Sequence, residues 1–518
     1  MRSFRNEKIY RILFWTAVFA GLFCFSFFAH PPVILDYDDW SYVSYFRPPV
    51  PWPAFWNPSR VLPECFMPFC GSVGALLYRV FPGLGYIRAE SLVFSVVLAG
   101  FETVYFFMFA RMLRAKLRTR PVCTAIAALV FCAFHFLIFR TAESGNTYLF
   151  RSANLTCFFF YLIPALLNCI LVMYFMSCEC AFVDFFSIRA GERNRKTRIL
   201  KKILILIAVY FAVFSNLFAN VVLAVYSALE IGKGLPERKK NGSAQPETSA
   251  FLKKYALGFL ILAMFAVSIG FEALGGRAKI SYGDHIPLIA GLLETLESTR
   301  QMFGAVSIPA LVSAGCILLL FGISVFLRHS DPVPGTEAPL RFLLRTLLSS
   351  VLIELYLIVL SSRVSALYAA RPDVILSFFF GIFLALAAML ACAMKTLPKT
   401  VLPAVILCLG MFLFANTPGR TFAESYAIDC EITPERCIGL SQDLVDQVLE
   451  AEKEGKDAVT IDVLFTGDYG SNWPQVTYLG ETLSRTLRKH GVIQRDMEVD
   501  VFPTDRINEK YGLVFELN

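Results

Sequence analysis

The sequence predicts a polytopic α-helical membrane protein with about eleven spans and a small C-terminal α/β domain outside the membrane. The chain of 518 residues is 56% hydrophobic and only 17% charged, whereas soluble domains are about 25% charged. Several apolar runs exceed the roughly 18 residues that indicate a spanning helix. Lys and Arg gather in short blocks between the runs, as in cytoplasmic loops, so the net charge of +7 does not indicate nucleic-acid binding.

The first span is expected from Ile12 to Ala29. It resembles a signal peptide, but it ends in HPPVILDYDD, which has no small-residue cleavage site, so we expect it to be retained. The basic residues before it place the N-terminus in the cytoplasm; they are Arg2, Arg5, Lys8 and Arg11.

A large outer loop, residues 30–89, is expected to follow. Its Pro-rich part, FRPPVPWPAFWNPSR, excludes a regular helix there. The moderately apolar part at 66–81, FMPFCGSVGALLYRVF, predicts an amphipathic helix lying along the membrane interface.

Residues 203–231 form one apolar run of 29 residues with basic segments on both sides. A single crossing would place one basic segment outside, which the positive-inside rule disfavours. The polar stretch SNLFAN lies at the middle of the run, and we therefore expect a hairpin of two short helices. The other spans are expected at 90–110, 121–139, 154–176, 255–273, 303–327, 342–361, 374–394 and 400–416.

The chain therefore divides into a membrane domain, residues 1–416, and an outer soluble domain, residues 417–518. The soluble part predicts helices at 441–454 and 476–490, and strands at 458–465, 497–502 and 511–517. Disulfides persist in an oxidising outer compartment, so we expect bonds between Cys430 and Cys437 and between Cys65 and Cys70.

An acidic cluster follows the first span directly. The stretch ILDYDDWSYVSYF contains Asp36, Asp38 and Asp39 among five aromatic residues. Such surroundings can raise the pKa of a carboxyl group toward the range of a general base. The alternative interpretation is a solvated acidic loop beside a helix end. Other polar residues expected on the outer side are Asn57, Arg60, Glu64, His285, Arg363, Tyr368 and Arg371.

This arrangement resembles the GT-C glycosyltransferases, polytopic enzymes that take a sugar from a polyprenyl-phosphate carrier. DYDDW is similar to their first-loop acidic motif, and WNPSRVLPECFMPFCG is similar to the following segment in bacterial serotype-conversion glucosyltransferases. The likeness has residue-level detail over about 34–71, and the motif here has three acids where many members have two. The resemblance implies a GT-C-like fold, a bacterial cytoplasmic membrane with the C-terminus outside, and an inverting transfer to a cell-surface glycan or glycolipid.

The resemblance also assigns roles to residues. Asp38 or Asp39 would be the base, with Asp36 beside it. A divalent cation, Mg²⁺ or Mn²⁺, is left open, with Asp36 and Asp38 as its ligands. Arg363, Arg371 and Tyr368 would hold the donor phosphate and sugar, because Arg binds phosphate bidentately; the alternative for the arginines is interfacial snorkelling. The residues expected around the acceptor are Asn57, Arg60, Glu64 and His285.

Two other classes of protein compete with a transferase. A transporter or flippase of lipid-linked oligosaccharide would use ionisable residues within spans, of which Glu102, His135, Glu272 and Glu354 are candidates. A surface-polysaccharide polymerase or ligase would use a large outer loop late in the chain, whereas the large loop here is the first.

Overall fold

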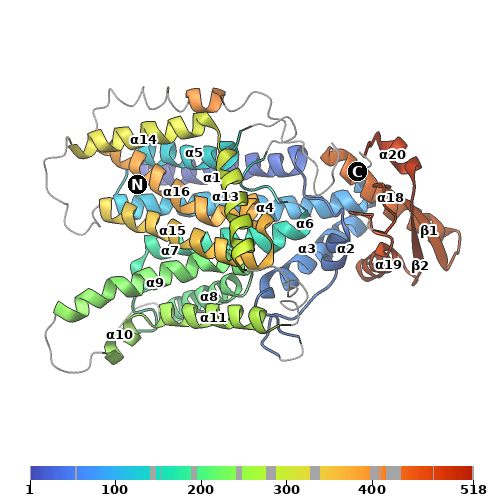
Figure 1. The fold of residues 1–518 in the computed structure, drawn as a ribbon, viewed down its shortest axis with the longest axis horizontal. Coiled ribbons are helices and arrows are strands. Elements are labelled where there is room, and N and C mark those ends of the chain that lie inside the picture. The colour runs from blue at the N-terminus through green and yellow to red at the C-terminus, as the bar shows by residue number, and fades with distance from the viewer. Residues whose placement is uncertain are drawn as a thin grey trace.

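The computed structural model describes residues 2–52, 55–140, 147–152, 154–187, 195–240, 248–275, 288–326, 339–396, 407, 410–415, 433–470 and 472–515. Within these residues the regular structure is helical, apart from one two-stranded sheet near the C-terminus. A long helical bundle makes up most of the molecule, and the C-terminal segment, drawn orange to red, lies at one end of it (Figure 1).

The helices of the bundle are α1 (Arg2–Cys24), η1 (Phe25–Ala29), α2 (Tyr37–Tyr42), α3 (Val61–Val80), η2 (Pro82–Leu84), α4 (Tyr86–Leu117), α5 (Pro121–Leu137), α6 (Leu155–Cys157), η3 (Phe158–Leu162), α7 (Ile163–Ser177), η4 (Glu179–Ala181), α8 (Arg195–Val213), α9 (Leu217–Lys240), α10 (Thr248–Lys254), α11 (Ala256–Leu274), α13 (Leu288–Gly304), α14 (Ile308–Phe326), α15 (Pro339–Val364), η5 (Ala366–Ala370) and α16 (Pro372–Thr396). Nine helices in the described part of the chain are long and apolar enough to cross a membrane. The protein is therefore a polytopic helical membrane protein.

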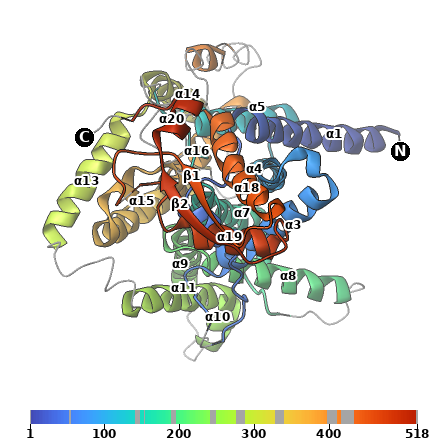
Figure 2. The same cartoon turned by 90° about the vertical axis from the view of Figure 1, so that its right-hand side faces the viewer.

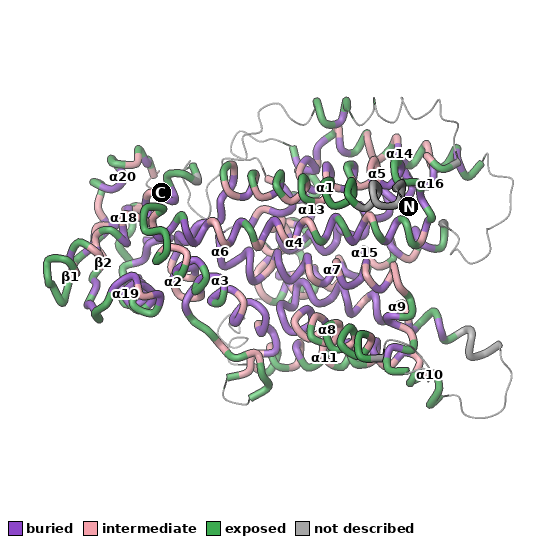
Figure 3. Tube along the Cα trace, turned by 180° about the vertical axis from the view of Figure 1, so that it is seen from behind, coloured by how far each residue is buried: buried purple, intermediate pink, exposed green. Residues whose placement is uncertain are grey.

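Two helices form the centre of the bundle. In α16, 94% of the most apolar stretch of 18 residues is buried inside the protein. In the helix of residues 155–177 the corresponding share is 83%. For α1 and α14 the shares are only 11% and 17%, and both expose apolar side chains such as Phe14 and Leu319. Buried positions accordingly concentrate in the central helices (Figure 3). Apolar outward faces on the peripheral helices match contact with lipid.

The expected interfacial helix at 66–81 is instead the middle and end of α3, a 20-residue helix that is itself long and apolar enough to span. Pro68 lies inside it and cannot donate to the carbonyl of Glu64. That carbonyl accepts a hydrogen bond from the backbone N–H of Arg47 at 3.0 Å. The loop before α3 therefore satisfies the backbone group that the proline releases, which allows the helix to continue.

The run 203–231 folds as the predicted hairpin. Helix α8 ends at Val213 and α9 begins at Leu217. Asn220 Nδ2 donates to the carbonyl of Val213 at 2.9 Å and so closes the turn. Lys201 on α8 and Lys233 on α9 line one cavity at the far end of the two helices, so both basic segments lie on the same side.

The bundle thus has two distinct ends. The α2 end carries α2, the start of α3 and the C-terminal segment (Figure 1). The basic end carries the cations on the last turn of α4, the first half of α8, the second half of α9 and the end of α10; they include Lys116, Arg198, Lys201, Lys202, Lys233 and Lys254.

The C-terminal segment is a small α/β unit. It consists of α18 (Pro434–Lys453), β1 (Ala458–Val463), α19 (Leu479–His490), β2 (Glu498–Pro503) and α20 (Asp505–Tyr511). Strands β1 and β2 pair in parallel, with Ala458 opposite Glu498, and α19 lies in the crossover between them. The predicted last strand is wrong over the described residues, because Thr504 caps α20 and Gly512, with φ of +60°, ends it.

The structure tests one of the two predicted disulfides. Cys65 and Cys70 are free thiols five positions apart in α3, where a helix of 3.6 residues per turn directs them to different faces; that prediction is wrong. Cys430 lies outside the described residues, as does the expected boundary at 416 and 417.

The C-terminal segment docks onto the hairpin of α3 and α4. His490, at the end of α19, has Nδ1 2.7 Å from the Tyr86 hydroxyl and 3.4 Å from Glu90 Oε1. Arg79 Nε donates to the carbonyl of His490 at 3.0 Å. A Cβ on Gly74 would lie 2.9 Å from the Cα of Glu90, so glycine is required where α3 crosses this cluster. Figure 2 shows the segment end-on, over the helices of the bundle.

Candidate functional site

The acidic cluster builds the start of α2. Asp36 is the N-cap residue, and its Oδ1 accepts the backbone N–H of Asp39 at 2.9 Å. Asp39 Oδ2 accepts the backbone N–H of Asp36 at 3.4 Å in return. This is a capping box, in which carboxylates three residues apart satisfy the free N–H groups of a helix start. Two of the three acids therefore have a structural role.

The same two carboxylates bind α2 to the start of α6. Asp39 Oδ1 accepts both the N–H and the hydroxyl of Thr156, each at 2.7 Å. Asn154 Nδ2 donates to Asp36 Oδ2, and the N–H of Leu35 donates to Asp39 Oδ2 at 3.1 Å. Both carboxylates are 0% exposed. Their oxygens are directed at protein donors, which leaves no path for a substrate hydroxyl.

Asp38 is different from its neighbours. It lies one position before Asp39 in α2, is half-buried, and has the guanidinium of Arg60 as its main charged neighbour. Burial raises the pKa of Asp38, and the Arg60 cation opposes this shift. Asp38 is thus the carboxylate of the cluster that combines partial solvent access with a raised pKa.

Burial also raises the pKa of the two capping carboxyls. It raises the pKa of Asp39 to about 6, against the hydrogen bonds from Thr156 and Leu35. It raises the pKa of Asp36 well above its usual value, and the nearby Asp39 charge adds to the effect. Two adjacent buried carboxyls disfavour double ionisation, so their titrations depend on each other.

Arg60 joins the acidic cluster to a pocket. Its Nη1 donates to the Tyr42 hydroxyl at 3.2 Å, and its guanidinium lies 5.5 Å from the centre of the Phe160 ring. The pocket is lined by Ser59, Arg60, Tyr161, Asn216, Leu217, Phe218, Glu272, Leu360, Val364 and Tyr368. These residues come from distant parts of the chain and meet where the turn of the α8–α9 hairpin approaches the start of α3.

Several pocket residues were not predicted as site residues. Glu272, whose Oε2 accepts the Ser59 hydroxyl at 2.8 Å, stands out in the sequence only as an ionisable residue within a span. Asn216 stands out only as part of the polar stretch in the hairpin. Tyr161 lies in an aromatic helix and carries no sequence signal; its hydroxyl donates to that of Tyr368 at 3.2 Å.

Arg371 reaches the edge of this region, but its guanidinium is already bound. Its Nε and Nη2 donate to the two oxygens of Asp373 at 3.1 and 2.8 Å. The same group lies 4.3 Å from the centre of the Tyr161 ring and 4.9 Å from that of Tyr368. The ion pair with Asp373 raises the pKa of Arg371 further above its usual value despite burial. Arg371 therefore orders the aromatic wall of the pocket.

The other predicted residues lie around the site. Arg363 is exposed in the last turn of α15 and is not among the residues that line the pocket. Glu64 is buried and paired with Arg47 at 2.8 Å. Asn57 Oδ1 accepts the N–H of Ser59 at 3.1 Å and so shapes the turn before Arg60. His285 lies outside the described residues.

The arrangement of the acidic cluster bears on the expected cation site at Asp36 and Asp38. Among the described residues, no group of three or more His, Cys, Asp or Glu side chains is arranged to hold a metal ion. Asp36 has both oxygens engaged by Asp39 N–H and Asn154, so it cannot join Asp38 as a ligand without releasing the start of α2. The expectation that Asp36 and Asp38 bind a cation together stays a prediction.

The C-terminal segment supports α2 from the other side. The Thr486 hydroxyl lies 2.8 Å from both the Trp40 carbonyl and the Ser44 hydroxyl. Lys489 Nζ donates to the carbonyl of Ser44 at 2.6 Å. Helix α19 thus holds the end of α2, while α6 holds its start.

No protein-family model, no curated protein and no solved structure matches this chain.

Proposed function

We propose that this protein is a membrane glycosyltransferase that moves a sugar from a polyprenyl-phosphate carrier to a glycan or glycolipid acceptor. The α2 end faces the outside of a bacterial cytoplasmic membrane in this proposal, and the basic end faces the cytoplasm, as the positive-inside rule predicts. The observation that carries the proposal is the half-buried Asp38 beside Arg60, next to a pocket with aromatic walls.

Asp38 is the general base. Its carboxylate takes the proton of the acceptor hydroxyl, and the freed oxygen forms a bond to the anomeric carbon of the sugar. The bond from that carbon to the lipid phosphate breaks, and the phosphate leaves with the electron pair. Attack opposite the leaving group inverts the anomeric centre. Asp36 and Asp39 hold α2 in place so that Asp38 keeps its direction.

Arg60 stabilises the leaving phosphate. Arg60 lines the pocket, and within the described part of the chain its guanidinium donates one hydrogen bond, to the Tyr42 hydroxyl at 3.2 Å. Its other N–H groups can therefore donate to a phosphate oxygen. Arg371 is less suited to this task because Asp373 occupies its bidentate edge. The donor sugar lies against the wall formed by Tyr161 and Tyr368. The electron-rich faces of aromatic rings attract the C–H groups of a sugar ring.

A transfer assay tests the proposal. Purified protein in lipid vesicles receives polyprenyl-phosphate sugars with a labelled sugar, together with extracted cell-surface glycan as acceptor. Wild-type protein and the Asp457→Asn variant, whose altered side chain is 92% exposed on the C-terminal segment, should transfer label equally. Asp38→Asn should transfer very little.

The same assay separates the competing classes. A flippase would move the labelled lipid across the vesicle membrane without forming a labelled glycan. Equal transfer by wild type and Asp38→Asn would show that Asp38 is not the general base. If no polyprenyl-phosphate sugar gives transfer, the proposed transferase function is wrong.

A further inference from the structure

Two cavities of opposite character meet at the basic end. The first is a cavity of about 720 Å³ lined by Arg198, Lys201, Lys202, Lys233 and Lys254. The second is an apolar slot between α7, α9, α15 and α16, with walls that include Met176, Val222, Tyr226, Phe342 and Phe380. Glu179 and Glu230 line both cavities, so the two cavities are adjacent.

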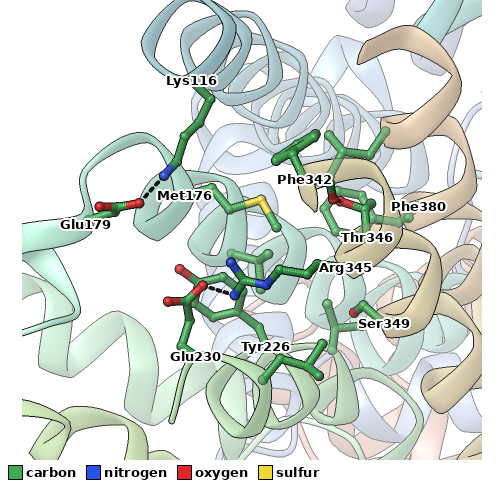
Figure 4. A pocket seen from close by; sticks show the side chains of 15 residues that line it. Lys116, Met176, Glu179, Tyr226, Glu230, Phe342, Arg345, Thr346, Ser349 and Phe380 are labelled. Atoms are coloured by element: carbon green, nitrogen blue, oxygen red, sulfur yellow. Dashed lines mark hydrogen bonds and ion pairs between the residues drawn. The ribbon is translucent and has the colours of Figure 1, made fainter. Parts of the chain in front are cut away.

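The charges that line the large cavity are unbalanced. Of its three acidic residues, Glu179 pairs with Lys116 and Glu230 pairs with Arg345; both cations belong to the slot. Figure 4 shows these two ion pairs among the side chains that line the slot, with Met176 between them and Phe342 and Phe380 to one side. Among the residues that line this cavity, cationic side chains therefore outnumber acidic ones by five to three. The cavity is thus rich in cations and adjoins the apolar slot.

We infer that the basic end binds a phosphate-bearing lipid, with the phosphate in the cationic cavity and the first part of one chain in the slot. Lys and Arg clusters near a membrane surface attract anionic lipid headgroups, and basic pockets between helices on the cytoplasmic side hold them. A free anion would need only the cationic cavity, whereas the aromatic and aliphatic slot provides an apolar surface for a lipid chain. This site lies at the opposite end of the bundle from Asp38 and does not depend on the proposed transfer reaction.

Lys201 and Lys233 are the central cations of this site. They lie on the two arms of the α8–α9 hairpin, and Lys201 Nζ is 5.7 Å from the centre of the Tyr174 ring at the cavity wall. A phosphate between them would join the arms of the hairpin at the end away from its turn. Lipid binding should then raise the thermal stability of the full-length protein.

Binding is measured by native mass spectrometry and by thermal shift on purified full-length protein. The ligands are phosphatidylglycerol, a polyprenyl phosphate, phosphatidylcholine and inorganic phosphate. Wild-type protein should bind one phosphatidylglycerol or polyprenyl phosphate more tightly than phosphatidylcholine. The double variant Lys201→Gln/Lys233→Gln should bind it ~10- to 30-fold more weakly, from about a factor of five per lysine. Lys253→Gln changes an exposed lysine next to this cavity that does not line it and should bind as wild type does.

A second variant tests the slot independently of the lysines. Ser349→Phe places a ring in the slot, where Ser349 is only half-buried; it should weaken lipid binding and leave binding of inorganic phosphate unchanged. Whichever of phosphatidylglycerol and polyprenyl phosphate binds more tightly identifies the class of lipid that the site takes. The inference is overturned by equal lipid binding in the wild type and the double lysine variant, or by inorganic phosphate binding as tightly as the lipids.

Discussion

The α2 end and the basic end both concentrate charged side chains, but they hold them differently. At the α2 end, Asp36 and Asp39 are completely buried, and backbone and side-chain donors fix their oxygens. At the basic end, the charges meet in ion pairs that reach solvent, as for Glu179, whose side chain is 58% exposed. Charges at the first end fix geometry, whereas those at the second set a local potential.

This difference predicts how each end responds to substitution. Removing an acceptor from a buried network leaves donors without partners, at a cost of about 1–3 kcal/mol for each. Removing one charge from an exposed pair costs about 0–1 kcal/mol. The α2 end should therefore be sensitive to single positions, and the basic end should respond mainly to combined substitutions.

The largest effect is expected for activity at Asp38. Asp38→Asn should lower the transfer rate on the order of 10²–10⁴-fold, because the amide cannot accept the proton. The apparent melting temperature should stay within a few degrees of that of the wild type, because Asp38 is not part of the capping box. Rate per folded molecule is measured in the transfer assay. A large fall in melting temperature with little loss of rate would assign Asp38 to the structural network instead.

The next effect is on stability at Asp39. Asp39→Ala removes the acceptor of four bonds, from the N–H groups of Leu35 and Asp36 and from the N–H and hydroxyl of Thr156. Loss of several kcal/mol is expected at about 1–3 kcal/mol per unpaired buried donor. Thermal shift in detergent measures it, with Asp38→Ala as the matched control. Similar melting temperatures for the two alanine variants would contradict the structural role of Asp39.

Arg60 should affect both rate and pH dependence. Arg60→Gln removes the cation that opposes the raised pKa of Asp38, so that pKa should rise further. A base is active when deprotonated, so the acid limb of the pH–rate profile should move to higher pH. The rate above this limb should also fall on the order of 10–10²-fold, the worth of a charged hydrogen bond to phosphate. An unchanged acid limb would show that Arg60 does not act on the base.

The pH dependence of stability should identify Asp39. Its pKa is raised from 3.8 to about 6 in the folded protein, so the folded state holds the proton more tightly than the unfolded chain. The contribution of this tighter proton binding to the free energy of unfolding is fully present below pH 3.8 and is lost as pH rises through about 6. The change is on the order of 3 kcal/mol. Melting temperatures across this range should fall more steeply with pH in the wild type than in Asp39→Asn, in which only the raised pKa of Asp36 remains; parallel curves would contradict it.

The sequence predicted the membrane class and the hairpin at 203–231, because these depend on local patterns. The functional site near DYDDW stays a prediction. The sequence also contained a signal that separates the three acids: Asp36 and Asp39 have the spacing of a capping box, and Asp38 does not. The pocket could not be predicted, because Tyr161, Glu272 and Tyr368 meet only through tertiary packing. The missed helix α13 packs across η5 beside this pocket and has too many polar residues to be identified as a span.

The smallest effect is expected at the basic end, and it should have the opposite pH dependence. The hydrogen bond from Lys116 lowers the pKa of Glu179 below its usual 4.5, so stability from this pair is present above that pH and is lost as pH falls. Glu179→Gln makes the same chemical change as Asp39→Asn, but its exposed position limits the cost to about 0–1 kcal/mol. The cost should disappear in high salt, which screens exposed charges more than buried ones. Thermal shift at low and high ionic strength measures this, with Lys116→Gln as the matched partner variant. A cost of several kcal/mol that persists in salt would mean that the ion pairs among the side chains that line the slot are as tightly fixed as the capping box, and the contrast between the two ends would fail.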